Sequence, residues 1–245
     1  MIKRSQRLLL GSVLLLMLWY LIAHSLNQAI LVPSPFAVFK TMMEQCQTQL
    51  FYLSLFETLW RIICGFSIAL AAALLFAVVT YFYPWFGQVC YPLLLVTRSI
   101  PNISYILIVL FWCSAQTSVM VISFFILFPT LYATLSQGLH DVPTSYHDVM
   151  KLYGGNQWFD LRYVYLPFLH SYFYTACKNG LSLALKVGVM AEILGQVSVG
   201  IGRQLNICRL NLDMSGVFAW TLWIMLLLAL MERIIAWLFH ANYKR

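Results

Sequence analysis

Hydrophobic residues along this chain fall into six long runs separated by short polar segments. A bilayer core about 30 Å thick is crossed by an α-helix of about 20 apolar residues. The runs cover about residues 8–31, 53–81, 89–112, 119–138, 164–194 and 217–239. The pattern predicts an all-α polytopic membrane protein with six transmembrane helices, forming a single domain over residues 1–245.

The segments between the runs differ in character. Val32-Pro33-Ser34-Pro35 ends the first run, because proline removes a backbone donor and restricts the residue before it. Residues 36–50 mix polar and apolar side chains and predict an amphipathic helix at the membrane surface. Arg98-Ser99-Ile100-Pro101 interrupts the third run, whereas Gly195–Ser215 contains glycines and predicts a loop.

Composition supports a membrane location and excludes several other classes of protein. The chain has 245 residues, of which 62% are hydrophobic and 9% charged, whereas soluble domains carry about 25% charged residues. The net charge of +7 comes from scattered residues without a basic stripe, which argues against binding to nucleic acid. The six cysteines form no C-x-x-C pair and no metal-ligand spacing.

The distribution of basic residues predicts the orientation. The basic start of the chain is similar to that of a signal peptide, but the first run is longer than a usual signal core and favours a retained helix. With the N-terminus inside, seven basic residues of the connecting segments are cytoplasmic and three (Lys40, Arg203 and Arg209) are outside. The positive-inside rule therefore places both termini, and residues 139–163, in the cytoplasm.

Residues 139–163 form the most polar segment of the chain and are long for a loop in a compact bundle. Pro143 suits a helix start, Ser145–Tyr153 can form two turns, and Gly154-Gly155 would stop them. Two short helices there would make a docking knob for a cytoplasmic partner. An ordinary amphipathic loop lying on lipid headgroups is the other interpretation.

Several short motifs in this chain resemble those of one family. Asp148-Val149-Met150, Gly154, then Leu166-Pro167 have the spacing of the coupling signature of ABC importer permeases, with Asp for Glu and Val-Met for two alanines. Trp158 matches members of the nitrate/sulfonate/taurine-type branch, the binding-protein-dependent transport system inner membrane components. The resemblance also covers Val32-Pro33-Ser34-Pro35, Thr58–Phe66, Arg98–Trp112 and Ala191–Gly202.

The resemblance implies that the chain is the permease subunit of an importer and is not itself an enzyme. It implies a homodimer, separate ABC ATPase subunits that bind ATP and magnesium, and an extracytoplasmic solute-binding protein in a bacterial inner membrane. The chain itself would hold no cofactor. Residues assigned to ATPase coupling are Asp148, Val149, Met150, Gly154, Trp158, Leu166 and Pro167. A sulfonate, nitrate, a thiamine or pyrimidine precursor and a flavin are all open as solutes.

Ionisable residues inside the membrane are costly and usually face the bundle interior or a water-filled path. Arg98, Lys186 and Glu192 are therefore candidates for the translocation pathway, and Arg98 and Lys186 would assist an anionic solute. Pro101 is a further candidate, because the helix it interrupts after Arg98 needs internal partners for its backbone and commonly lines a cavity. The alternative is structural pairing of these cations with Glu57 or Glu192. Glu57 and Arg61 are four residues apart, which predicts a local ion pair on one helix.

Two other functions compete with the importer. A membrane metal enzyme would use His140-Asp141 and His147-Asp148, but Pro143 separates the pairs and a third ligand cluster is missing from the sequence. A secondary transporter driven by an ion gradient would show matching helix breaks in both halves, whereas only Pro101 marks a strong break. The sequence has no Walker-type glycine loop, so ATP hydrolysis would require a partner.

Overall fold

The computed structural model describes residues 4–26, 28, 30–143 and 165–243 of the chain. Every regular element in these ranges is helical, so the predicted all-α class is confirmed. The helices are α1 (Arg4–Leu26), α2 (Pro35–Cys46), α3 (Gln49–Phe82), α4 (Pro84–Ser99), α5 (Asn102–Trp112), α6 (Ala115–His140), α9 (Leu166–Gly195), α10 (Ile201–Leu210) and α11 (Met214–Tyr243).

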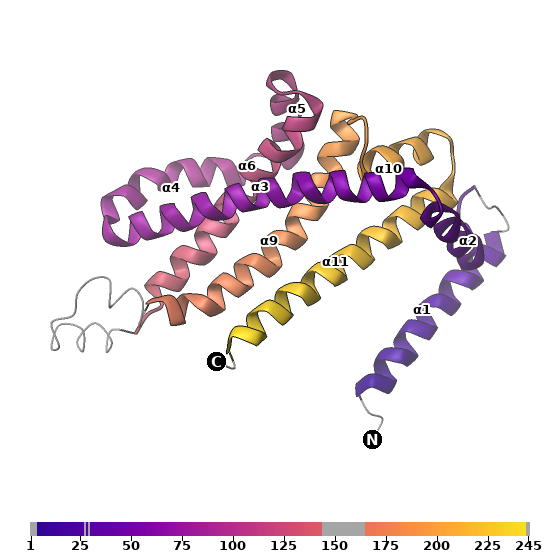
Figure 1. Cartoon of the computed structure of the whole chain (residues 1–245), viewed down its shortest axis with the longest axis horizontal. Coiled ribbons are helices and arrows are strands. Elements are labelled where there is room, and N and C mark those ends of the chain that lie inside the picture. The colour runs from indigo at the N-terminus through magenta and orange to yellow at the C-terminus, as the bar shows by residue number, and fades with distance from the viewer. Residues whose placement is uncertain (1–3, 27, 29, 144–164, 244–245) are drawn as a thin grey trace.

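Three long helices, α3, α6 and α9, form the centre of the protein. α3 crosses over α6 and α9, which run diagonally beneath it, and α4 returns alongside the second half of α3 (Figure 1). Ala69, Ala73 and Ala77 of α3 are fully buried in the main core. Small residues at every fourth position allow two helix backbones to approach closely, which explains why α3 and α6 make the most extensive contact.

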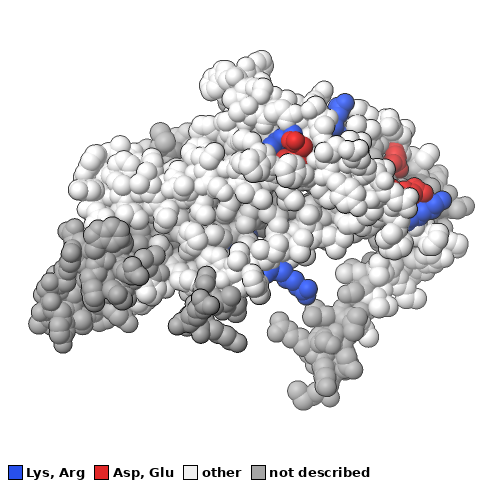
Figure 2. All heavy atoms as spheres, in the orientation of Figure 1, with Lys and Arg blue, Asp and Glu red and all other residues white. Residues whose placement is uncertain are grey.

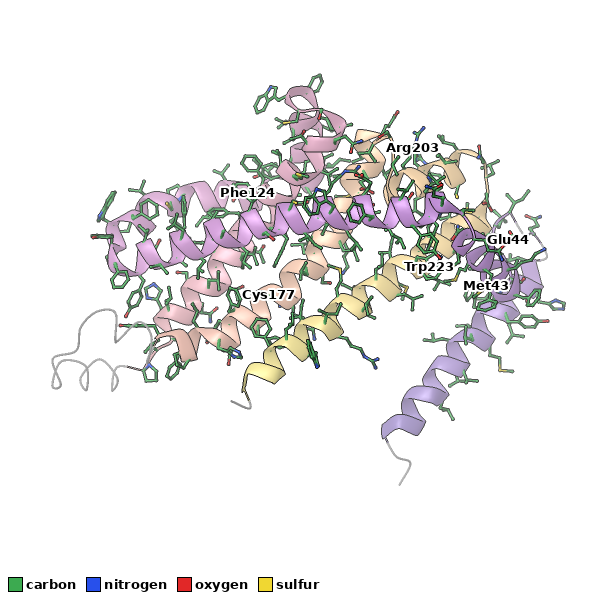
Figure 3. All side chains as sticks on the ribbon, in the orientation of Figure 1. Met43, Glu44, Phe124, Cys177, Arg203 and Trp223 are labelled. Atoms are coloured by element: carbon green, nitrogen blue, oxygen red, sulfur yellow. The ribbon has the colours of Figure 1, made fainter. Side chains whose placement is uncertain are left out.

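The predicted amphipathic segment 36–50 largely forms α2. Ser34 caps this helix by accepting a hydrogen bond from the Ala37 backbone at 3.2 Å, and Pro35 occupies its first turn. Val38 and Met42 are buried against α11, so one face of α2 belongs to the protein interior. The indole of Trp223 on α11, which is labelled in Figure 3, also donates to the Gln45 side-chain oxygen at 3.1 Å.

One predicted helix end and one predicted loop are wrong. The first helix ends at Leu26 instead of continuing to about residue 31, because polar residues follow and the Gln28 carbonyl accepts turn hydrogen bonds from Leu31 and Val32. The predicted loop over 195–215 contains the ten-residue helix α10. Its apolar residues Ile201, Leu205 and Cys208 follow helical spacing and pack on the main core, which offsets the unfavourable glycines.

Three helices in the described ranges are long and apolar enough to cross a membrane: α3, α6 and Met214–Phe239 of α11. Val13–Leu26 and α5 are shorter apolar helices. α9 has thirty residues and therefore sufficient length, but it also carries polar side chains. The helices thus support a membrane protein, while the count of six spans stays a prediction.

The predicted interruption of the third run is present as a break between α4 and α5. α4 ends at Ser99, Ile100 has extended backbone angles, and α5 begins after Pro101. α5 projects from the body of the molecule (Figure 1). Its last two residues, Phe111 and Trp112, are 89% and 82% exposed.

Charged side chains are unevenly distributed over the described surface. Acidic and basic atoms on the face shown in Figure 2 gather over α10, α2 and the first half of α3, and most of the remaining described surface is uncharged. Both chain termini lie along the opposite side of the view, as do the end of α6 and the start of α9 (Figure 1).

Candidate functional site

Arg61 of α3 and Glu192 of α9 form an ion pair inside the protein. Arg61 Nη1 lies 2.8 Å from Glu192 Oε1, and the two side chains are 3% and 0% exposed. Thr58, on α3, donates its hydroxyl to the Glu192 carboxylate at 2.9 Å, and the Gly202 backbone N–H donates at 2.9 Å. A buried carboxylate needs this number of donors, because an unpaired charge away from water is strongly unfavourable.

The Arg61 guanidinium also contacts groups other than Glu192. Arg61 Nη2 lies 2.9 Å from Glu57 Oε2, which confirms the predicted pair at i,i+4 spacing. Arg61 Nη1 donates to the Val199 carbonyl at 2.9 Å, and Thr58 accepts from the Ile201 backbone at 2.8 Å. These contacts tie α3 to the end of α9 and the start of α10. We name Thr58, Arg61 and Glu192 the buried charge cluster; Glu57, whose side chain is 42% exposed, lies at its edge.

Gly200 and Gly202 make room for the buried charge cluster. A Cβ on Gly200 would lie 2.7 Å from both carboxylate oxygens of Glu192. A Cβ on Gly202 would lie 2.5 Å from the Glu192 Cβ and 2.6 Å from the Val189 carbonyl oxygen. Only glycine allows the backbone to approach this closely, so the Gly-Ile-Gly motif after the fifth run serves the packing of Glu192.

Glu192 is fully buried in the described structure, and a role for it in the translocation pathway stays a prediction. Its carboxylate is enclosed between α3, α9 and α10 and faces no solvent, unlike a residue that lines a water-filled path. Structural pairing with Glu57 or Glu192 is the alternative for Arg98 and Lys186, but in the described residues both carboxylates contact Arg61. Lys186 pairs with neither Glu57 nor Glu192 in the described structure.

A polar face runs along α9 on the other side of this helix. Its members recur every three or four residues and are exposed or half-buried: Ser171, Thr175, Asn179, Ser182 and Lys186. This spacing places them on one helix face. In a membrane-spanning helix such a face is directed to protein or to water, because contact with lipid is unfavourable for polar groups. We name these five residues the α9 polar face.

A pocket of 220 Å³ lies next to the α9 polar face, at the break between α4 and α5. Leu183, which lies between Asn179 and Lys186 on α9, contributes to its lining, as do Thr97, Asn102 and Thr130. Tyr105 donates its hydroxyl to the Thr97 carbonyl at 3.0 Å, which satisfies a backbone acceptor near the break. The broken helix thus provides polar groups beside α9.

The other predicted pathway residues occupy this region or its edge. Pro101 is exposed and precedes α5, and Lys186 is exposed within the α9 polar face. Arg98 lies near the end of α4, and its side chain is outside the described part. The sequence interpretation missed Thr175, Asn179 and Ser182, although their helical spacing within an apolar run was a visible signal.

Two of the predicted coupling residues begin α9, and the other five precede it in the sequence. Leu166 and Pro167 are its first two residues, and Pro167 is exposed. Asp148, Val149, Met150, Gly154 and Trp158 lie outside the described residues, as does His147. His140 ends α6, where its ring lies 5.8 Å from that of Tyr81. The described residues contain no cluster of three potential metal ligands.

An all-helical membrane bundle with a polar face along a central helix has the features of a protein that conducts a polar solute. The chain belongs to the family described as binding-protein-dependent transport system inner membrane component, which matches residues 62–241. The family predicted from the sequence motifs is therefore confirmed. The chain is a permease subunit of an ABC-type transport system.

Two relatives agree with this family. The riboflavin transport system permease protein RibX of Chloroflexus aurantiacus is 26% identical over 135 residues, covering 55% of this chain and 50% of RibX. The formylaminopyrimidine transport permease protein ThiX of Halalkalibacterium halodurans is 25% identical over 222 residues, covering 89% of this chain and 88% of ThiX. The chain therefore spans about half of RibX and most of ThiX.

A similar solved structure is a crystal structure of an amino acid ABC transporter with histidines. It matches with a TM-score of 0.63 and 18% identity, covering 80% of this chain and 94% of that chain. This likeness concerns the fold.

Removal of one member of the buried ion pair is expected to destabilise the protein. Arg61→Ala leaves Glu192 as an unpaired buried charge, and Glu192→Ala leaves Arg61 without its main partner. Each should lower the free energy of unfolding by about 3–5 kcal/mol, and the double variant should lose less than the sum. Thermal unfolding of the purified proteins in detergent measures this, with Arg233→Ala, an exposed cation of α11, as the control.

Gly202→Ala should lower stability by about 1–3 kcal/mol, because the new methyl group meets the Glu192 side chain and a backbone carbonyl. Gly11→Ala is the matched control, since a Cβ on Gly11 of α1 has no atom within 4 Å. The same unfolding assay should show Gly11→Ala at or slightly above the wild-type temperature. Equal unfolding temperatures for both variants would contradict the packing role of Gly202.

Proposed function

We propose that this chain forms the translocation pathway of an ABC importer for a small polar solute and couples the pathway to ATP hydrolysis by a separate subunit. The α9 polar face is the observation that carries this proposal. It gives a membrane helix a surface that lipid does not solvate, next to a broken helix and a pocket. Family membership supplies the transport class.

The α9 polar face becomes a pathway when a second copy of the chain lies opposite it. Such a homodimer would enclose two copies of this face in the bilayer and keep them away from lipid. Lys186 makes no ion pair with any described residue, so its ammonium group is free to meet a solute. A solute with a negative or oxygen-rich group would be favoured by this donor.

The energy source in this proposal is a partner ATPase with bound ATP and magnesium. Asp148, Val149, Met150, Gly154 and Trp158 would contact that subunit on the cytoplasmic side, where both termini also lie. Leu166 and Pro167 begin α9, so a force applied to the preceding segment would reach the α9 polar face along one helix. An extracytoplasmic binding protein would deliver the solute from the opposite side of the bacterial inner membrane.

The solute is proposed at the level of a class. The two relatives are named for transport of riboflavin and of formylaminopyrimidine, which are both nitrogen heterocycles. Their names favour a pyrimidine precursor or a flavin over a sulfonate or nitrate. A heterocycle with ring carbonyls can accept a hydrogen bond from Lys186 and from the hydroxyl and amide groups of the α9 polar face.

The importer and an ion-driven secondary transporter differ in their energy source. The importer should co-purify with an ATPase subunit from its native membrane, and proteoliposomes of that complex should accumulate solute when ATP is supplied on the cytoplasmic side. Uncouplers of the proton and sodium gradients should leave uptake unchanged. Uptake by the purified chain alone that follows an ion gradient would instead support the secondary transporter.

Lys186→Ala should reduce uptake about tenfold at unchanged expression, because a charge-assisted hydrogen bond contributes about 1.5–3 kcal/mol. Lys186→Arg should retain most of the uptake, since it keeps a cationic donor on the same helix face. The matched control is Arg233→Ala, which removes an exposed cation from α11. Normal uptake by Lys186→Ala would show that Lys186 is not part of the pathway.

A further inference from the structure

The described residues on either side of the segment 144–164 make hydroxyl hydrogen bonds to the helix bundle. At the first end, the Tyr172 hydroxyl of α9 donates to the Asp141 carboxylate, which directly follows α6. At the second end, the hydroxyls of Tyr165 and of Tyr81 on α3 are 2.7 Å apart. Tyr165 is the residue before α9. We name Tyr81, Asp141, Tyr165 and Tyr172 the tyrosine brace.

The ring of Tyr81 contacts residues on both sides of the segment 144–164. The Tyr81 ring lies 5.2 Å from the Tyr165 ring and 5.8 Å from the His140 ring, so the end of α3 touches the chain on both sides of the segment. Tyr172 lies directly over Gly138 of α6, where an added Cβ would be 2.6 Å from the tyrosine ring. α3, α6 and α9 therefore meet at the brace.

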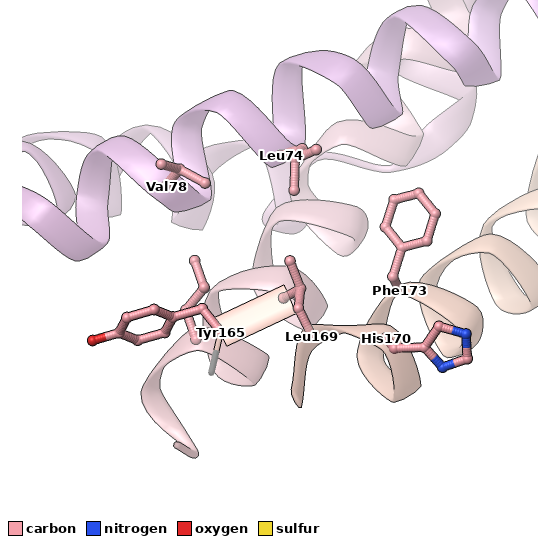
Figure 4. A pocket seen from close by; sticks show the side chains of 7 residues that line it. Leu74, Val78, Tyr165, Leu169, His170 and Phe173 are labelled. Carbon is pink, nitrogen blue, oxygen red and sulfur yellow. The ribbon is translucent and has the colours of Figure 1, made fainter. Parts of the chain in front are cut away.

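Apolar packing between α3 and α9 is incomplete at this point. A pocket of 360 Å³ separates Leu74 and Val78 of α3 from Tyr165, Leu169 and Phe173 at the start of α9 (Figure 4). Dispersion contacts are lost across such a gap. The Tyr81–Tyr165 pair thus connects α3 and α9 beside this gap.

We propose that the tyrosine brace transmits movement of the segment 144–164 to α3 and α9, with its four members as positioning residues for coupling. The proposal rests on the proposed function, in which the ATPase acts on this segment. When the brace is intact, displacement of the segment moves α9 and α3 together and so shifts the α9 polar face. When one hydrogen bond is absent, part of the displacement is taken up locally and α9 moves less.

The test measures ATP hydrolysis and solute uptake together in proteoliposomes of the complete transporter. Tyr81→Phe and Tyr172→Phe each remove one hydroxyl and keep the ring. Each should lower the solute imported per ATP hydrolysed about three- to tenfold, with unchanged ATPase content and hydrolysis rate. Tyr52→Phe, at an exposed tyrosine in the first half of α3, is the matched control and should match the wild type.

A second pair of variants separates coupling from a purely structural effect. Asp141→Asn keeps an acceptor for the Tyr172 hydroxyl and should couple nearly as well as the wild type, whereas Asp141→Ala should behave like Tyr172→Phe. The double variant Asp141→Ala/Tyr172→Phe should be no worse than either single one. All variants should unfold within a few degrees of the wild type.

The outcomes distinguish failure of this proposal from failure of the proposed function. A wild-type chain that neither binds an ATPase nor imports solute with ATP would contradict the proposed function itself. A wild-type chain that imports with ATP, together with Tyr81→Phe and Tyr172→Phe variants that import as many solute molecules per ATP, would overturn the brace alone. Loss of the ATPase subunit from the Phe variants would also overturn it, because the residues would then serve assembly.

Discussion

The buried pair of Arg61 and Glu192 is the constraint on which the arrangement of the helices depends. Two charges without water are tolerated only when every donor and acceptor around them is in place, so Thr58 and the Gly202 amide must stay where they are. This requirement fixes α3, the end of α9 and the start of α10 relative to one another. A buried pair of this kind adds little net stability compared with apolar packing, but a shift in helix register would leave a charge unpaired.

The two ends of α9 are held in different ways. The end at Glu192 is held by charges and by glycine contacts that allow no displacement without clashes. The start of α9 is held by aromatic contacts, such as those of His170 and Tyr174 with Phe239 of α11, and by hydroxyl hydrogen bonds beside a pocket. Such hydrogen bonds are individually weak and can be exchanged. α9 is therefore held more firmly at its C-terminal end than at its N-terminal end, and the α9 polar face lies between the two ends. This arrangement suits a helix whose tilt changes during transport.

Much of the fold follows from local sequence signals, whereas the site depends on distant contacts. Long apolar runs predicted the helices, and i,i+4 spacing predicted the Glu57–Arg61 pair. Nothing local indicates that Glu192 is the second partner of Arg61, because 131 residues separate them. α10 was missed because glycine is unfavourable in isolated helices, while here packing on α3, α9 and α11 outweighs that preference. The α9 polar face was not predicted, because four of its five residues are uncharged and the cost of a charge inside the membrane does not single them out.

The division of the third run into α4 and α5 has a consequence for the surrounding lipid. Eleven residues give α5 a length of roughly 16 Å, about half of a bilayer core, so neither piece reaches from one surface to the other in the way a continuous helix does. The depth of Phe111 and Trp112 is then set by the angle at Pro101. Aromatic rings prefer the headgroup level. A thinner or thicker bilayer would bend this joint, and the width of the neighbouring polar pocket would vary with the lipid chain length of the host membrane.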